Sequence, residues 1–356
     1  MSWFSIDAVD GALQRTKHAL LEPFAFWKWI KLGIIILLLG GSGGGGGGGS
    51  NIGNLGQQFG GEDPDFGPVS QGFGEAITQV PQFLYQYMTY ILIGLFLFVV
   101  FILLLSYISN VMEFVFVNSL VTDVVTFWAY TRKYLRQGFN LFMIRFILGL
   151  VFLLLIMIAT LPVILPILNL PGNVENFDFG ILFGGIFLFL GVLFILAIIS
   201  GIIQSFINLS IPLAMYQDIG IIAAFRIVLG TFKVDWKQII VYWIVRFILR
   251  LVIGIIVALA AIVLFIVVFG IIFIVGFGLY LLLSSGAGLG IEDIMFWVIM
   301  VPFGMVAFVL LFMFGLLVSV PVPVFMKYHM LTFLQSWYPE SGIPFFDGST
   351  IEQSPD

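Results

Sequence analysis

The sequence predicts an all-α, polytopic transmembrane helix bundle of about six spans, and three observations support that prediction. The chain is 61% hydrophobic and only 9% charged, with a mean hydropathy of +1.16, whereas a soluble domain carries about 25% charged residues. Apolar runs of the roughly 17 to 25 residues needed to cross a hydrocarbon core recur along the chain. The 14 Lys and Arg residues fall into four groups separated by long apolar stretches, as expected for loops on alternate sides of a membrane.

The basic groups predict which side of the membrane each loop occupies. They are Arg15, Lys17, Lys28 and Lys31; Arg132, Lys133, Arg136 and Arg145; Arg226, Lys233, Lys237, Arg246 and Arg250; and Lys327. Acidic residues such as Glu62, Glu175 and Glu292 lie instead in loops without bases. Because basic loops stay on the cytoplasmic side during insertion, we expect a multipass protein of the cell membrane with both termini cytoplasmic.

The chain begins with two short elements. Residues 1–23 predict an amphipathic helix lying in the inner interface, because their apolar residues fall near one helical face. The first span, residues 24–39, is short and has two lysines at its inner end. A glycine run at 40–50 opens an outer loop, residues 40–82. It is either an engineered linker or a natural flexible loop, and the low-complexity composition that continues beyond the glycines favours the natural loop.

The remaining spans complete a membrane domain at residues 24–320. They are expected at about 84–109, 140–168, 181–209, within 239–283, and at 294–320. Inner amphipathic segments are predicted at 111–138 and 212–238. The run 239–283 has room for one span or two. One span ending near Phe269 is favoured, with 270–283 as an outer or re-entrant piece, because two spans would place Lys327 outside, against the charge rule. A cytoplasmic tail, residues 321–356, follows.

An internal repeat supports this arrangement. RFILGLV at 145–151 returns as RFILRLV at 246–252, with six of seven positions identical, and each copy follows an acid, Asp123 or Asp218. The tail contains a partial copy, since PVFM at 323–326 resembles PLAM at 212–215. We therefore predict three repeat units in parallel orientation.

Small residues within the spans predict close helix packing. The positions are Gly184, Gly185, Gly191, Gly304 and Gly315.

The layout also resembles a known family. An amphipathic N-terminal helix, a short first span and a glycine run directly after it resemble an uncharacterised group of archaeal multipass membrane proteins, over nearly the whole chain. The stretch P-x-A-M-Y-x-D at 212–218 is similar, more loosely, to the membrane domain fused to some glycerophosphodiester phosphodiesterases. Neither resemblance implies a reaction, because the catalytic barrel of the phosphodiesterases is absent from this sequence.

Three arginines within apolar runs are the candidate site: Arg145, Arg246 and Arg250. An arginine within a span is costly and commonly marks a functional site. One interpretation is that these residues bind an anionic headgroup or phosphate on the cytoplasmic side. The other is structural: they reach the interface or form ion pairs with acidic residues. The candidate partners are Asp123, Asp218 and Glu113.

The sequence offers little for catalysis. It has no cysteine and only two histidines, at opposite ends of the chain, so we expect no catalytic residue, metal or cofactor, and no nucleic-acid partner. We predict a non-enzymatic membrane protein that organises lipid or a partner complex through its Arg rows and amphipathic helices. Its partners would be membrane lipid and a protein partner or a second copy. The alternative is a transporter or channel with a pathway between the repeats, although the spans have few polar residues to line one.

Overall fold

The computed structural model describes residues 3–40, 72–168 and 179–346, and these residues form helices and turns without a strand. The helices are α1 (Phe4–Leu21), α2 (Phe26–Leu38), α3 (Gly72–Val121), α4 (Phe127–Leu168), α5 (Phe179–Tyr216), α6 (Ile221–Val234), α7 (Trp236–Leu281), α8 (Ile294–Val318) and α9 (Pro321–Trp337). A π-helical turn, η3 (Leu282–Gly286), ends α7, and a 3-10 turn, η4 (Pro339–Ser341), follows α9.

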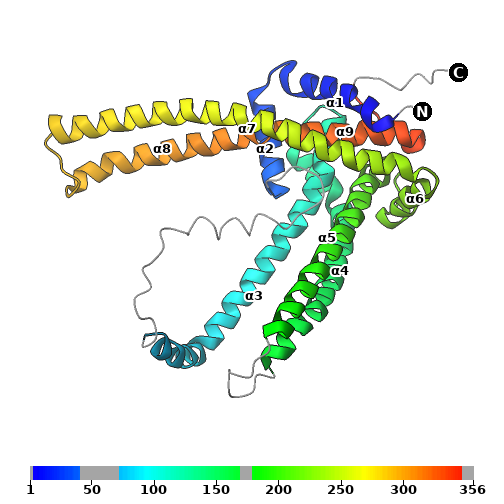
Figure 1. Ribbon diagram of the computed structural model, residues 1–356. Coiled ribbons are helices and arrows are strands. Elements are labelled where there is room, and N and C mark those ends of the chain that lie inside the picture. The colour runs from blue at the N-terminus through cyan, green and yellow to red at the C-terminus, as the bar shows by residue number, and fades with distance from the viewer. Residues whose placement is uncertain (1–2, 41–71, 169–178, 347–356) are drawn as a thin grey trace.

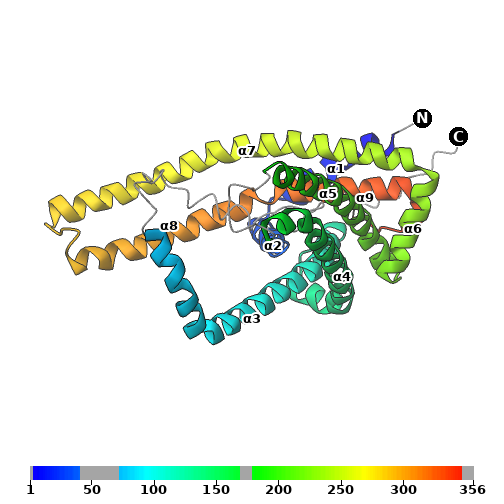
Figure 2. The same ribbon diagram turned by 60° about the horizontal axis from the view of Figure 1, so that its bottom comes forward.

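The molecule has two long arms that meet in a central hub (Figures 1 and 2). We call the outer parts of α3, α4 and α5 the first arm, and the outer parts of α7 and α8 the second arm. The hub consists of α1, α2, α6 and α9 together with the adjoining ends of α3, α4, α5 and α7. The two arms leave the hub in different directions (Figure 1).

The arms are apolar on all sides. Five described segments are long and apolar enough to cross a membrane: Tyr87–Val121, Phe127–Leu165, Phe183–Tyr216, Trp236–Gly286 and Ile294–Trp337. Their most apolar windows are at most 11% buried. A helix that is hydrophobic all round and not covered by protein is suited to lipid. The prediction of an all-helical multipass membrane protein is therefore confirmed at this level, whereas the six spans and three repeats are not.

Helix α2, the predicted first span, lies in the hub. It has 13 residues, which corresponds to about 20 Å and is less than the roughly 30 Å of a hydrocarbon core. Leu32, Ile35 and Ile36 are fully buried. A Cβ added to Gly33 would lie 3.1 Å from the carbonyl oxygen of Leu316, so α2 and α8 pack almost backbone to backbone.

Two other elements differ from the sequence prediction in their extent. Helix α3 continues without a break to Val121, so the inner segment 111–138 comprises the end of α3, a short turn and the first turns of α4. Helix α7 is a single helix through the whole run from 239, including the portion expected to be a separate outer piece. The predicted glycine-rich loop lies outside the described residues up to position 71, and α3 already begins at Gly72.

The expected tail contains the most buried helix of the hub. Twelve of the 17 residues of α9 are buried, and α9 packs along α1 (Figure 1). Arg15 Nη1 donates to Thr332 Oγ1 at 2.8 Å, and His329 Nε2 lies 3.0 Å from the carbonyl oxygen of Ser5. Residues 321–337 are therefore part of the core rather than a loose extension, and both ends of the described chain are anchored in the hub. Residues 347–356 lie outside the described part.

Close helix approach occurs at few of the predicted glycines. A Cβ added to Gly185 would lie 2.5 Å from the carbonyl oxygen of Pro162, which confirms close packing of α4 and α5 at that position. The other four predicted positions, Gly184, Gly191, Gly304 and Gly315, have no heavy atom within 4 Å of such a Cβ. Helices α3 and α4 approach each other closely at Gly138, where an added Cβ would lie 2.8 Å from Val111 Cα.

Candidate functional site

A ladder of polar side chains joins the hub ends of α3 and α4. Tyr134 OH donates to Asn118 Oδ1 at 3.2 Å, and the hydroxyls of Thr122 and Tyr130 lie 3.3 Å apart. The close approach at Gly138 brings the two helices near enough for these contacts. Glu113 is on the same helix, α3, five residues before Asn118.

Glu113 binds two cations from different parts of the chain. Its Oε2 atom lies 2.9 Å from Arg145 Nη2 on α4, and its Oε1 atom lies 3.1 Å from Lys327 Nζ on α9. The side chains of Glu113 and Lys327 are 9% and 2% exposed, and that of Arg145 is 19% exposed. This is a buried ion triad, in which the cations gain Coulomb energy and hydrogen bonds that offset the cost of their desolvation.

Arg145, on α4, is held by side-chain oxygens from the two neighbouring helices, α3 and α5. Its Nη1 atom donates to Asn110 Oδ1 of α3 at 2.7 Å, and its Nη2 atom donates to Asn208 Oδ1 of α5 at 3.0 Å. With its amide oxygen turned toward the guanidinium, Gln204 of α5 accepts from Nε and Nη2 at 3.1 Å. The rigid fork of donors on an arginine suits this multiple contact, so Arg145 fixes α3, α4 and α5 to one another.

The neighbouring part of α7 adds a further cation. Arg246 donates to the hydroxyl of Tyr242 and lies over its ring, 5.6 Å from the centroid. Tyr242 is fully buried and stacks on Phe333 of α9 at 4.4 Å between centroids. Arg246 also lies within electrostatic range of Lys327 and of Arg250, one turn further along α7.

The cluster is therefore rich in positive charge. Arg145 and Lys327 share the carboxylate of Glu113, and Arg246 lies within electrostatic range of Lys327 and of Arg250. Guanidinium and ammonium groups gathered in one place are suited to an anionic ligand at the accessible edge of the cluster. Arg250 is the exposed member of the group.

The structure brings together some of the predicted site residues and separates others. It pairs Arg145 with Glu113, as one interpretation expected. It pairs Asp123 with Lys28, at 2.6 Å, rather than with an arginine of the cluster. Asp123 and Asp218 each occupy a turn with positive φ, 56° and 50°, a conformation that Asp adopts more readily than most residues. Both residues belong to turns between helices: Asp123 binds Lys28, and Asp218 is exposed.

Sequence reasoning missed Lys327 and the three amides around Arg145. Lys327 is the single member of the last basic group, and in the sequence alone it serves only to predict the topology. Lys327 lies four residues after Pro323, within an apolar stretch. A single base in such a stretch is also typical of a buried lysine that is paired with an acid. The amides Asn110, Asn208 and Gln204 lie near the hub ends of their spans, but their convergence on one arginine depends on the packing of three helices.

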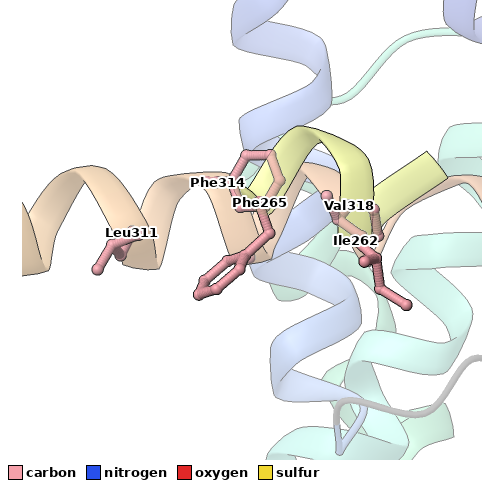
Figure 3. A pocket seen from close by; sticks show the side chains of 7 residues that line it. Ile262, Phe265, Leu311, Phe314 and Val318 are labelled. Carbon is pink, nitrogen blue, oxygen red and sulfur yellow. The ribbon is translucent and has the colours of Figure 1, made fainter. Parts of the chain in front are cut away.

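An open apolar groove lies between α7 and α8 where the second arm leaves the hub (Figure 3). Its volume is about 340 Å³, and it is lined by Ala261, Ile262 and Phe265 of α7 and by Leu311, Phe314, Gly315 and Val318 of α8. Every lining residue is apolar or glycine, so the groove is suited to a hydrocarbon chain.

In the part of the chain that the structure describes, no group of three or more His, Asp or Glu side chains is placed to hold a metal ion. Comparison with known proteins gives one match. The model of a family of unknown function, DUF7544, matches residues 3–343. No curated protein matches, and no solved structure does. The comparisons therefore leave the archaeal source and the phosphodiesterase resemblance as expectations.

Proposed function

We propose that this chain, which belongs to the family of unknown function DUF7544, is a non-enzymatic integral membrane protein that gathers anionic lipid around its hub. One observation supports the proposal above all: the bases lie in the hub and at its junction with the arms, and the arms have none. No Lys or Arg occurs in residues 32–131, 146–225 or 251–326. The arms are thus suited to hydrocarbon and the hub to a negatively charged membrane face.

The surface of the hub has the composition of a membrane interface. Six of its exposed cations lie on the first turns of α4, on α6 and at the start of α7: Arg132, Lys133, Arg136, Arg226, Lys233 and Lys237. Trp128 and Trp236, 73% and 50% exposed, lie beside them. Tryptophan at a headgroup boundary together with lysine and arginine is typical of a protein surface in contact with anionic lipid.

The lipid content of a reconstituted bilayer tests this proposal. In nanodiscs of mixed phosphatidylglycerol and phosphatidylcholine with identical acyl chains, we expect the purified protein to retain phosphatidylglycerol at several times its bulk ratio, as measured by native mass spectrometry. Each surface cation contributes about 1 kcal/mol of attraction to an anionic leaflet. Replacing four hub cations, Arg132, Lys133, Arg226 and Lys233, by Gln should therefore remove most of the enrichment.

The matched control changes charge at the other end of the molecule. Glu292→Gln, in the turn between α7 and α8, alters net charge without touching the hub and should leave the lipid ratio unchanged. A wild-type protein that retains the two lipids in their bulk ratio would contradict the proposal.

We further propose that the hub faces the cytoplasm, with both termini, and that the turn between α7 and α8 faces outside. The chain has no cysteine, so single cysteines can be introduced directly. Lys133 and Ala287, both exposed, mark the two sides. An impermeant maleimide applied to intact cells should label Ala287→Cys and reach Lys133→Cys only after permeabilisation, with the Cys-free protein as the blank. Labelling of Lys133→Cys on intact cells would contradict the proposed topology and place the hub outside.

The transport alternative receives less support. In the described spans, the amide side chains of Asn110, Asn208 and Gln204 lie at the hub end and bind Arg145. A conducting path needs polar groups along its length.

A further inference from the structure

One face of α7 has basic residues at one end and small and apolar residues along the rest of its length. Residues at spacings of three and four fall within a ~100° arc of an α-helix. On α7 this arc contains Arg246, Arg250, Gly254, Val257 and Ala261. The face therefore begins with two guanidinium groups, passes small residues, and ends at the first lining residue of the apolar groove.

The middle of this face is open. A Cβ added at Gly254 would meet no heavy atom within 4 Å, and Ala258 beside it is exposed. Atoms of the described residues do not cover α7 at that position, between Arg250 and the groove. A slender apolar chain has room to lie there against the helix.

The dimensions match one layer of a bilayer. Arg250 and Ala261 are eleven residues apart, or about 16 Å along the helix at 1.5 Å per residue. Half of a hydrocarbon core of roughly 30 Å is about 15 Å. If the guanidinium groups lie at the boundary between headgroups and hydrocarbon, the groove lies near the midplane, where an acyl chain ends.

We propose that α7 binds one anionic phospholipid, with its phosphate at Arg246 and Arg250 and one acyl chain along Gly254 into the groove between α7 and α8. The inference rests on the proposed function and makes it specific, since it assigns one lipid molecule to one site. Charge complementarity selects the headgroup, because Arg246 and Arg250 place two guanidinium groups one turn apart on the same face of α7. Arginine binds phosphate oxygens in a bidentate manner. The apolar lining of the groove selects the chain.

The test uses the full-length protein in detergent, with phosphatidylglycerol and phosphatidylcholine of identical acyl chains as probes and native mass spectrometry as the readout. We expect Arg250→Gln to lower the ratio of bound phosphatidylglycerol to phosphatidylcholine about tenfold, the loss of one charge-assisted contact, and Arg250→Lys to keep most of it. Gly254→Trp should lower the amount of both lipids, because the indole ring occupies the chain's path. Gly270→Trp is the matched control: its Cβ also meets nothing within 4 Å, and it lies beyond the groove.

The outcomes separate this site from the broader proposal. If wild-type protein shows no preference for phosphatidylglycerol, both the site and the proposed function fail. If the preference exists but Arg132→Gln, on the hub surface, lowers it as much as Arg250→Gln does, the hub surface recognises the headgroup, so the site on α7 is wrong and the proposed function stands. Equal lipid retention by Gly254→Trp and Gly270→Trp would overturn the acyl-chain path.

Discussion

Glu113→Gln should lower the free energy of unfolding by about 3–5 kcal/mol, the usual cost of removing one partner from a buried ion pair. The substitution keeps the size of the side chain and removes its charge. Arg145 retains its three amide contacts, but Lys327, with a side chain only 2% exposed, loses the carboxylate that it binds at 3.1 Å. The stability of the detergent-solubilised protein, measured by thermal unfolding with circular dichroism, provides the readout.

A second substitution separates the charge effect from a general loss of packing. In Glu113→Gln/Lys327→Met the uncompensated ammonium is gone, so the double variant should be clearly more stable than the single variant, and the two sites should show a strong coupling energy. Glu22→Gln is the control for an exposed pair: Glu22 lies 2.8 Å from Lys17, but both side chains are more than half exposed, and its loss should change stability little. If the Glu113→Gln variant and the wild type unfold at the same temperature, the triad does not stabilise the hub.

Gly138→Ala should destabilise the protein by about 3 kcal/mol, at the upper end of the usual cost of overpacking. The new methyl group would lie 2.4 Å from Val111 Cγ2 and 2.8 Å from Val111 Cα. The second contact is with the backbone, so rotation of a side chain cannot relieve it and α3 and α4 must move apart. That movement would also lengthen the polar ladder from Tyr134 to Asn118 and the contact between Arg145 and Glu113.

Gly149→Ala on the same helix is the matched comparison for this prediction. Its added Cβ has no heavy atom within 4 Å, and alanine is the better helix former by about 1 kcal/mol, so this variant should be as stable as the wild type or slightly more so. Equal melting temperatures for the two alanine variants would contradict the proposed close contact of α3 and α4.

The sequence alone determined the helical class of this protein and the location of the segments that are apolar enough to cross a membrane. Both follow from local properties. A run such as 251–281, with no charged residue, has one stable state in a bilayer, a helix that satisfies its own backbone hydrogen bonds. The number of spans in 239–283 is predicted from the position of a distant charge, Lys327, and the structure shows one helix, α7, as far as Leu281.

The tertiary structure decided what the charged residues do. Glu113 and Lys327 are 214 residues apart, and they meet only because α9 folds back into the hub beside α1. A sequence pattern cannot report that meeting, because ion pairing depends on distance in space and falls steeply once water enters between the groups. The same holds for Asp123, which is near Arg145 in sequence but binds Lys28 because its turn faces α2. Apolar character is a property of each segment by itself, so hydropathy placed the arms. The contacts within the hub depend on which segments pack together, and only the tertiary structure of the described residues shows that packing.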